Sequence, residues 1–492
     1  MTERTPTTGC IIDTPYGALT GARSDGVVSF SRVPYASPPV RRLRLRLPEP
    51  VRPWKEPLDC TREGPVPPQL PSRLAKIMGD YPALQDEDCL HLDIWVPENG
   101  SAEMPVFVFL HGGAFMTGGG SLPCYDGALL AKNTATIVVN VSYRLGALGF
   151  LPIKGVAPAN LGLHDQIAAL RFIREIAPAL GGDAANITVA GQSAGAFSIA
   201  LLLATPAHRT LFKRSIMMSA PLGLELPSVE ASEPLGQDYM TALRLAPDDR
   251  DGIEAQPIER LIAAQLELLK AKAGTPGDVT PPFLPVIDGE LVPVNPLEAL
   301  VGGAAADAEV MIGTTREEMT AFHYGDEGLA KVADEVTVAA FRRHYGDQAE
   351  RAMREARARR MPATGLSLLG DLMTDAVFAG PSLAVAHAQV EEGRSPYVYR
   401  FDWQSPTPDI KACHCIELPF LFGNLGTWRE APMLAGADMR ELADLSRVFQ
   451  GALAAFARSG TPEGPGLPAW PDHGSRRVVQ HFNSFIQAAA AA

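Results

Sequence analysis

The chain has 492 residues, of which 46% are hydrophobic and 20% charged, proportions that are typical of an ordinary globular protein. A formal net charge of −13 argues against a nucleic-acid partner, because such a partner requires a basic surface. No window holds the ~18 uninterrupted apolar residues of a membrane span, and the first residues lack the basic start and apolar run of a secretory signal, so we expect a cytoplasmic protein with no membrane partner.

A basic run at residues 41–46 is the first unusual feature of the chain. Its arginines alternate with apolar residues in a strand-like way, and prolines stand on either side. We interpret it as a solvated edge of the protein and not as a binding patch.

The segment 105–203 alternates between short apolar runs and helical spacing. Strands are predicted at residues 106–110, 136–142 and 187–190, a helix at 163–180, and a second helix that follows the last strand and ends near Leu203. A fourth strand is predicted at 215–219. Continuous apolar strands that alternate with helices indicate a mostly parallel sheet covered by helices on both faces.

The chain changes character after about residue 220. Residues 221–275 and 326–360 are acidic or rich in alanine and leucine, and they predict helical excursions laid over the sheet. Further strands are predicted at 310–313 and 397–401. We therefore expect residues 1–487 to form one α/β catalytic domain, and the alanine run 488–492 to be a disordered tail or a remnant of cloning.

The clearest chemical motif is the pentapeptide 191–195, which has the pattern G-x-S-x-G between a predicted strand and a predicted helix. A nucleophilic serine on such a sharp turn projects above the sheet, and the residues two before and two after it must leave room. The N-terminus of the following helix favours a developing negative charge. Ser193 is therefore the candidate nucleophile of a hydrolase with the α/β-hydrolase fold.

A serine hydroxyl needs a base to take its proton, and the base needs an acid to fix its tautomer. In this fold the chain order is serine, acid, histidine, which excludes the histidines that precede Ser193: His91, His111 and His164. His414 lies in a loop-like stretch after the 397–401 strand and is the candidate base. The acid should follow a strand, and Glu317 and Glu318 both fit; the spacing does not choose between them.

The third component is a set of backbone donors for the oxyanion. Residues 111–115, His-Gly-Gly-Ala-Phe, follow the 106–110 strand, and their glycines allow N–H groups to face the site. A plain glycine turn is the alternative for this segment taken alone.

The six cysteines are too few for a disulfide scaffold in a chain of this length: Cys10, Cys60, Cys89, Cys124, Cys413 and Cys415. Two of them flank His414, but a zinc-like second pair is missing. We interpret them as small packing side chains and expect neither a metal nor another cofactor.

Taken together, these motifs resemble the type-B carboxylesterases, the family of bacterial para-nitrobenzyl esterases and animal cholinesterases. The resemblance covers nearly the whole chain and includes the 30–39, 87–92, 142–146, 162–166 and 181–183 segments, the Ser193 turn and residues 414–420. It implies that the acid is Glu318, in the family pattern G-x-x-x-[DE]-E-G. It also implies that Gly113, Ala114 and Ala194 supply the oxyanion donors, with Gly112 in support.

The chain departs from the family pattern at three places that bear on function. Gln192 replaces the acidic residue usual before the nucleophile, which argues against a cation-binding role like that of cholinesterases. Met319 replaces the glycine usual after the acid. The partner of Cys89 would fall near Pro67, so the family disulfide is lost, and we do not expect Cys60 to replace it.

We therefore predict a carboxylic-ester hydrolase that acts through a Ser193 acyl-enzyme on small to medium apolar or aryl esters. Similarity of residues 412–428 to bacterial phenylcarbamate hydrolases leaves a carbamate or amide hydrolase with the same triad as the alternative. A non-catalytic, cholinesterase-like adhesion protein is disfavoured because both nucleophile and base are present. The sequence leaves the oligomeric state open. Six apolar residues are predicted to line the substrate pocket: Met116, Leu122, Met218, Phe283, Met319 and Phe322.

Overall fold

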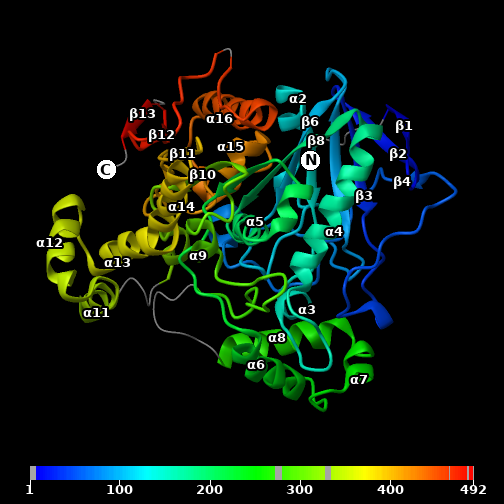
Figure 1. Ribbon diagram of the computed structural model, residues 1–492, viewed down its shortest axis with the longest axis horizontal. Helices are drawn as coiled ribbons and strands as arrows, with labels where there is room; N and C mark the ends of the chain where they lie inside the picture. The colour runs from blue at the N-terminus through cyan, green and yellow to red at the C-terminus, as the bar shows by residue number, and fades with distance from the viewer. Residues whose placement is uncertain (1–6, 272–279, 327–333, 465, 485–486, 491–492) are drawn as a thin grey trace.

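The centre of the molecule is a large twisted sheet (Figure 1), seen in a computed structural model that describes residues 7–271, 280–326, 334–464, 466–484 and 487–490. Within these residues the strand order is β1-β2-β3-β5-β7-β6-β8-β9-β10-β11-β12-β13, and β4 pairs with β2. Pairing is parallel from β7 through β6 to β12, whereas the β1-to-β7 end and β13 pair antiparallel. The strands that frame the sheet are β1 (Thr7–Thr14), β2 (Gly17–Ser24), β3 (Val27–Pro34), β4 (Leu58–Asp59), β5 (His91–Pro97), β12 (Val478–Phe482) and β13 (Gln487–Ala490).

The predicted α/β architecture with a mostly parallel sheet is confirmed. Every strand expected from an apolar run is present: β6 (Met104–Leu110), β7 (Ile137–Val141), β8 (Gly182–Gln192), β9 (Arg214–Met218), β10 (Glu309–Thr315) and β11 (Tyr397–Phe401). Strand β8 begins five residues before the predicted strand, because its polar start pairs with β6 at the edge of the apolar region. The antiparallel strands at the N-terminal end were not predicted.

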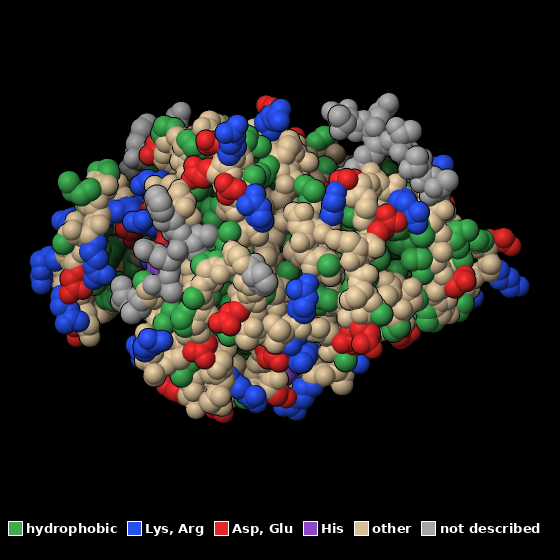
Figure 2. Space-filling view, turned by 90° about the horizontal axis from the view of Figure 1, so that it is seen from above, with side chains coloured by type: hydrophobic (Ala, Val, Ile, Leu, Met, Phe, Trp, Pro, Cys, Tyr) green, Lys and Arg blue, Asp and Glu red, His purple; other side chains and the backbone are tan. Residues whose placement is uncertain are grey.

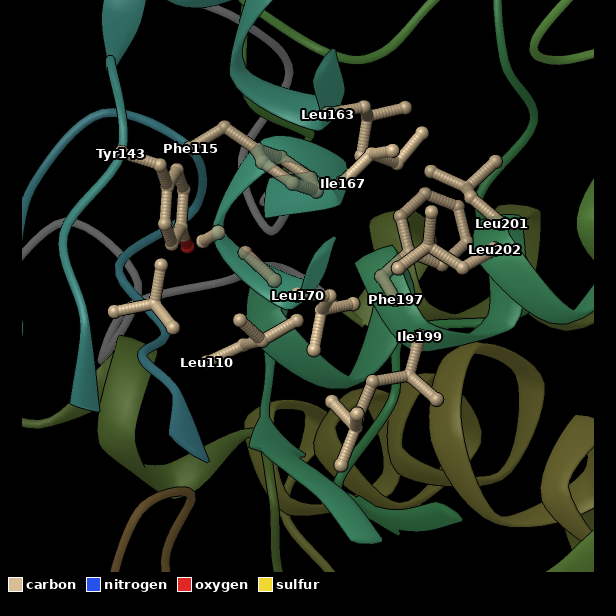
Figure 3. Close-up of a cluster of buried hydrophobic side chains, with 14 of the residues drawn as sticks. Leu110, Phe115, Tyr143, Leu163, Ile167, Leu170, Phe197, Ile199, Leu201 and Leu202 are labelled. Atoms are coloured by element: carbon tan, nitrogen blue, oxygen red, sulfur yellow. The ribbon is translucent and has the colours of Figure 1, made fainter. Parts of the chain in front are cut away.

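Both faces of the central strands are buried, as continuous apolar runs require. In β6, Val106, Val108 and Leu110 belong to one hydrophobic cluster, and the alternate residues Phe107 and Phe109 belong to another. The first cluster contains α4 (Leu161–Ile176) and α5 (Ala194–Leu203), and Figure 3 shows their side chains around Leu110. The second contains α16 (Met439–Ser459) and α2 (Ala128–Thr134). This packing fixes the carboxyl ends of β6, β8 and β10, where the candidate residues lie.

Two groups of helices lie at the periphery (bottom and left in Figure 1). The first group is α6 (Val229–Ala242), α7 (Arg250–Glu254) and α8 (Ile258–Ala271), inside the predicted excursion 221–275. The second is α11 (Asp334–Tyr345), α12 (Ala349–Arg359) and α13 (Gly365–Thr374), so it extends beyond the predicted end at residue 360. This group has a small hydrophobic cluster of its own, which includes Phe341 and Leu368.

One helical run, Gly365–Glu391, has the length and mean hydropathy of a membrane span. It comprises α13, the π-helical turn Asp375–Ala379 and α14 (Gly380–Glu391). Its last part packs against β10, β11 and α9 (Pro296–Val301), as the core helix of a globular protein does.

Two expectations about the chain surface require correction. Residues 41–43 form a short 3-10 helix, and Arg44 is buried, with its guanidinium 2.6 Å from Glu87 and donating to the carbonyl of Ile253. The basic run is therefore not wholly a solvated edge, because Arg44 links it to Glu87 and Ile253 inside the protein. The alanine run is in part ordered, because the backbone of 487–490 pairs with the open edge of β12; residues 491–492 lie outside the described residues.

Candidate active site

The turn between β8 and α5 holds Ser193 in a strained backbone conformation, with φ 55° and ψ −121°. A Cβ on Gly195 would lie 2.0 Å from the carbonyl oxygen of Leu110, and one on Gly191 would lie 2.6 Å from the carbonyl carbon of Gly195. Both positions therefore require glycine, for the reason that the motif predicted. Since α5 begins at Ala194, the N–H groups of its first turn have no acceptor within the helix. Ser193 and Ala194, the first residue of that turn, line the same cavity.

His414 and Glu318 form a fully buried pair beside this turn. His414 Nδ1 lies 2.5 Å from Glu318 Oε2, while Glu318 Oε1 accepts a hydrogen bond of 2.8 Å from the Thr315 N–H. Glu318 follows β10, and His414 lies between β11 and α15 (Leu418–Phe422). A carboxylate on Nδ1 places the ring proton there, which leaves Nε2 as the acceptor. The pair thus has the arrangement of a base oriented by an acid.

Two aromatic rings enclose His414 on the cavity side. The Phe322 and Phe378 rings have centroids 5.3 and 5.2 Å from the imidazole centroid. Both rings line the cavity, so they shield the imidazole from water and shape the space in front of Ser193. Phe378 lies in the π-helical turn and was not predicted; its position follows from the fold of a segment far from the motifs in sequence.

Glu317 is oriented away from the imidazole, and it is not solvent-facing as an ordinary helix-start acid would be. Its carboxylate is buried, 3.3 Å from Arg360 and 3.7 Å from Arg316, and it accepts a hydrogen bond of 3.2 Å from the Ala412 N–H. Through the Ala412 N–H, Glu317 therefore holds the segment that carries His414 in place. Its role in the structure is an ion pair and a backbone contact.

The loop that follows β6 is held by contacts from two other segments of the chain. Tyr143 donates from its hydroxyl to the carbonyl of His111 at 2.6 Å and stacks on the His111 ring. Gly113 has φ +119°, and a Cβ there would lie 2.0 Å from the Thr117 carbonyl oxygen. Gly112, Gly113 and Ala114 line the same cavity as Ser193 and Ala194. The structure thus brings together all the predicted oxyanion residues.

The second residue that holds this loop is Gln69, which was not predicted from the sequence. The Gly118 N–H donates to Gln69 Oε1, and Gln69 Nε2 donates to the Gly118 carbonyl, both at 2.7 Å. Cys60 and Cys89 are buried and free, so no disulfide links them. The segment between them, which forms one wall of the cavity, is joined to the loop through this paired amide.

The cavity in front of Ser193 has a volume of about 420 Å³. Of the six predicted pocket residues, Met116, Leu122 and Phe322 line it. The other three do not: Met218 and Phe283 are buried in the core, and Met319 packs on Val377 and Phe378 and lines a separate cavity together with Glu317. The prediction was wrong for these three residues because hydrophobic periodicity does not show which face of a turn or strand meets the cavity. Much of the remaining wall comes from residues 66–85.

The two cysteines beside His414 are packing groups. Burial raises the pKa of both the Cys413 and the Cys415 thiols well above the usual range, so they remain protonated. Within the described ranges, no three His, Cys, Asp or Glu side chains are grouped so as to hold a metal ion.

A second carboxylic acid, Glu417, lies close to the pair. It is fully buried, and the Ser219 hydroxyl donates to its Oε1 at 3.3 Å. Burial, and then the nearby charge of Glu318, raise its pKa from the ordinary 4.5 to about 8. Glu417 is therefore protonated in the folded protein at neutral pH, so a single negative charge stands near His414.

This raised pKa makes stability depend on pH. Below pH 4.5 Glu417 is protonated in both the folded and the unfolded states. Between pH 4.5 and about 8 only the folded state keeps the proton, so the free energy of unfolding falls progressively, by a total on the order of a few kcal/mol, and the loss is complete above about pH 8. We expect Glu417→Gln, which mimics the protonated acid, to match the wild type in Tm at pH 5 and to exceed it by several degrees at pH 9. Calorimetry at the two pH values measures this. A Tm difference that does not change with pH would contradict it.

Comparison with known proteins places these features in a family context. The model of the carboxylesterase family matches residues 9–485. The chain is 36% identical over 471 residues to phenmedipham hydrolase of Pseudarthrobacter oxydans, and 36% identical over 466 residues to para-nitrobenzyl esterase of Bacillus subtilis; each alignment covers 94% of this chain and 92% of the relative. A solved para-nitrobenzyl esterase structure superposes with a TM-score of 0.86 at 34% identity, covering 98% of this chain and 97% of the other. A carboxylesterase of Geobacillus stearothermophilus gives 0.85 at 33% identity, covering 97% of each chain.

Proposed function

The chain belongs to the carboxylesterase family and is an ester hydrolase, and on this premise we propose that Ser193, His414 and Glu318 are its catalytic triad. The observation that carries the proposal is the buried Glu318–His414 pair, which opens on the same cavity as the strained Ser193 turn. Among the described residues that line this cavity, His414 is the only histidine, so no second triad is formed there.

Hydrolysis then proceeds in two halves through an acyl-enzyme. Ser193 Oγ attacks the ester carbonyl while His414 Nε2 accepts its proton, and Glu318 stabilises the imidazolium that forms. The N–H groups of Gly113, Ala114 and Ala194 donate to the oxyanion. The imidazolium returns the proton to the departing alcohol. Water repeats the sequence to release the carboxylic acid.

The cavity supports an uncharged substrate with apolar or aryl groups. Its described lining is dominated by apolar and aromatic side chains, among them Leu224, Tyr81 and Tyr125, and its ionisable side chains besides His414 and buried groups are Arg73 and Asp80, of opposite sign. Acidic and basic side chains are also interspersed over most of the face shown in Figure 2. A substrate with a fixed positive charge would lose hydration without a net negative site to replace it.

The substrate class is tested with matched compounds of the same size. We expect the neutral ester 3,3-dimethylbutyl acetate to be hydrolysed with a kcat/KM at least about tenfold above that of the acetate ester of choline, because a difference of ~1.4 kcal/mol in desolvation suffices for this ratio. Steady-state kinetics at one pH measure both. A preference for the choline ester would contradict the proposal of an uncharged alcohol group.

The alternative, a carbamate or amide hydrolase, has a specific argument in the resemblance of residues 412–428 to phenylcarbamate hydrolases. Phenyl acetate, methyl N-phenylcarbamate and acetanilide separate the classes. We expect the ester to react fastest. A higher kcat/KM for the carbamate or the anilide would make that alternative the principal activity of the same triad.

A further inference from the structure

Gln192, the last residue of β8, places its carboxamide against the base. Its side chain is 1% exposed, and its Nε2 lies 3.2 Å from His414 Nε2. The absence of a side chain on Gly112 makes room for it, because a Cβ there would lie 2.7 Å from Gln192 Oε1. An amide nitrogen only donates, so this contact is a hydrogen bond from Gln192 to the lone pair of His414 Nε2. Within the described residues, Gln192 is the hydrogen-bond partner of that atom.

We propose that Gln192 stabilises the neutral form of His414 in the free enzyme, by donating to the Nε2 lone pair until the Ser193 hydroxyl takes its place there, and thereby extends esterase activity to lower pH. The proposal rests on His414 being the base, as proposed above. An imidazolium would present an N–H to the amide N–H₂ group, so two donors would face each other until the carboxamide rotated. Gln192 is thus a positioning residue, which acts through the base.

The charges of the other groups around His414 determine whether the neutral imidazole or the imidazolium is favoured. Glu318 favours the imidazolium from the Nδ1 side. Glu417, Cys413 and Cys415, on the segment of His414 itself, are protonated at neutral pH. From the remaining elements the Phe322 and Phe378 rings, which carry no charge, pack on the imidazole. Glu317, which holds the Ala412 N–H, is paired with Arg360 and Arg316. Glu318 is therefore the negative charge in contact with the imidazole, and the neutral Gln192 keeps a second one away from Nε2.

A carboxylate at position 192 would reverse this balance. It would accept a hydrogen bond from Nε2–H and attract the imidazolium at about 3 Å, where an opposite charge shifts a titration by roughly 1–3 pH units. The neutral form of the base would then be reached only at higher pH. Gln192 therefore separates this chain functionally from relatives that have an acid before the nucleophile.

The test compares two variants at position 192 with a control elsewhere. The kcat/KM for an uncharged ester is measured from pH 4.5 to 9. We expect Gln192→Glu to move the acid limb of the profile to higher pH by at least one unit, with the plateau at pH 9 within about tenfold of the wild type. Gln192→Met, which has similar length but no donor, should move the limb in the same direction by a fraction of a unit.

Gln166 supplies the matched control. It is a buried glutamine on α4 whose Nε2 donates to Ser198 at 3.1 Å, away from His414. Gln166→Met should leave the acid limb where it is. An equal shift in Gln166→Met, or an unchanged limb in Gln192→Glu, would overturn the proposal.

A second readout separates this proposal from the role of His414 in catalysis. The NMR signal of the buried His414 Nδ1 proton reports ring protonation without turnover. If its titration moves in Gln192→Glu while the rate profile stays, the proposed effect on activity is refuted, and the failure lies with His414, which is then not the base. If neither moves, the Gln192 proposal fails, and the proposed triad still stands on its own variants.

Discussion

Replacing Ser193 with alanine is expected to lower kcat roughly 10⁴-fold or more, with a residual rate above that in water because the oxyanion donors remain. The expectation follows from the position of the hydroxyl, on a turn that projects into the cavity beside His414. An organophosphate should add to the same oxygen, and peptide mass spectrometry of the inhibited enzyme locates the adduct.

Ser198, one helical turn along α5, is the matched control. It is also buried, but its hydroxyl donates to the Ala194 carbonyl and accepts from Gln166, and it does not line the cavity. Ser198→Ala should therefore change kcat by less than tenfold. An adduct on Ser198, with Ser193 unmodified, would refute the assignment of the nucleophile.

Glu318→Gln is expected to lower kcat by a similar amount, ~10⁴-fold in the worked case of a triad acid changed to its amide. The Thr315 N–H requires an acceptor at Oε1, so the variant's amide oxygen is held there and its N–H₂ group faces His414 Nδ1. That nitrogen must then accept, which places the ring proton on Nε2. The imidazole can no longer take the proton of Ser193. Single-turnover kinetics with an activated ester measure the loss.

The neighbouring acid tests whether the effect is specific. Glu317→Gln keeps an acceptor for the Ala412 N–H but loses the ion pair of the buried Glu317 carboxylate with the partly buried Arg360. We expect a lower Tm and a kcat within about tenfold of the wild type, because breaking a buried pair chiefly destabilises the fold. If Glu317→Gln were instead the inactive variant, the roles of the two acids would be exchanged.

The elements of the fold that could be predicted are those in which the buried residues form a continuous apolar run in the sequence. Strand β11 was predicted with its observed bounds because a five-residue run, apolar or aromatic except for Arg400, stands between polar segments. The N-terminal strands alternate polar and apolar residues and pair at the edge of the sheet, so no continuous apolar run marks them. The alanine strand β13 is set by the free edge of its neighbour β12, which is tertiary information.

The candidate site follows the same division. Ser193, the Gly112 loop and the glycines of the turn were recognisable because chemistry and backbone geometry restrict the residue types at those positions. The choice between Glu317 and Glu318 came from the family resemblance, since adjacent acids look alike in sequence. The partners Gln69, Phe378 and Arg360 come from distant segments, and each contact exists only because the fold brings its segment to the cavity.

The strained turn at Ser193 also limits where substitutions can raise the thermal stability of this enzyme. A non-glycine residue at such a backbone position costs about 1–3 kcal/mol, and glycine would relieve that cost only by removing the nucleophile. The crowded neighbours at 191 and 195 admit no larger side chain. Stability and turnover are therefore opposed at this turn, and selection for a hardier enzyme has to act far from it. The peripheral helices α11 and α12, which contribute to a small separate hydrophobic cluster, are the better place for such stabilising substitutions.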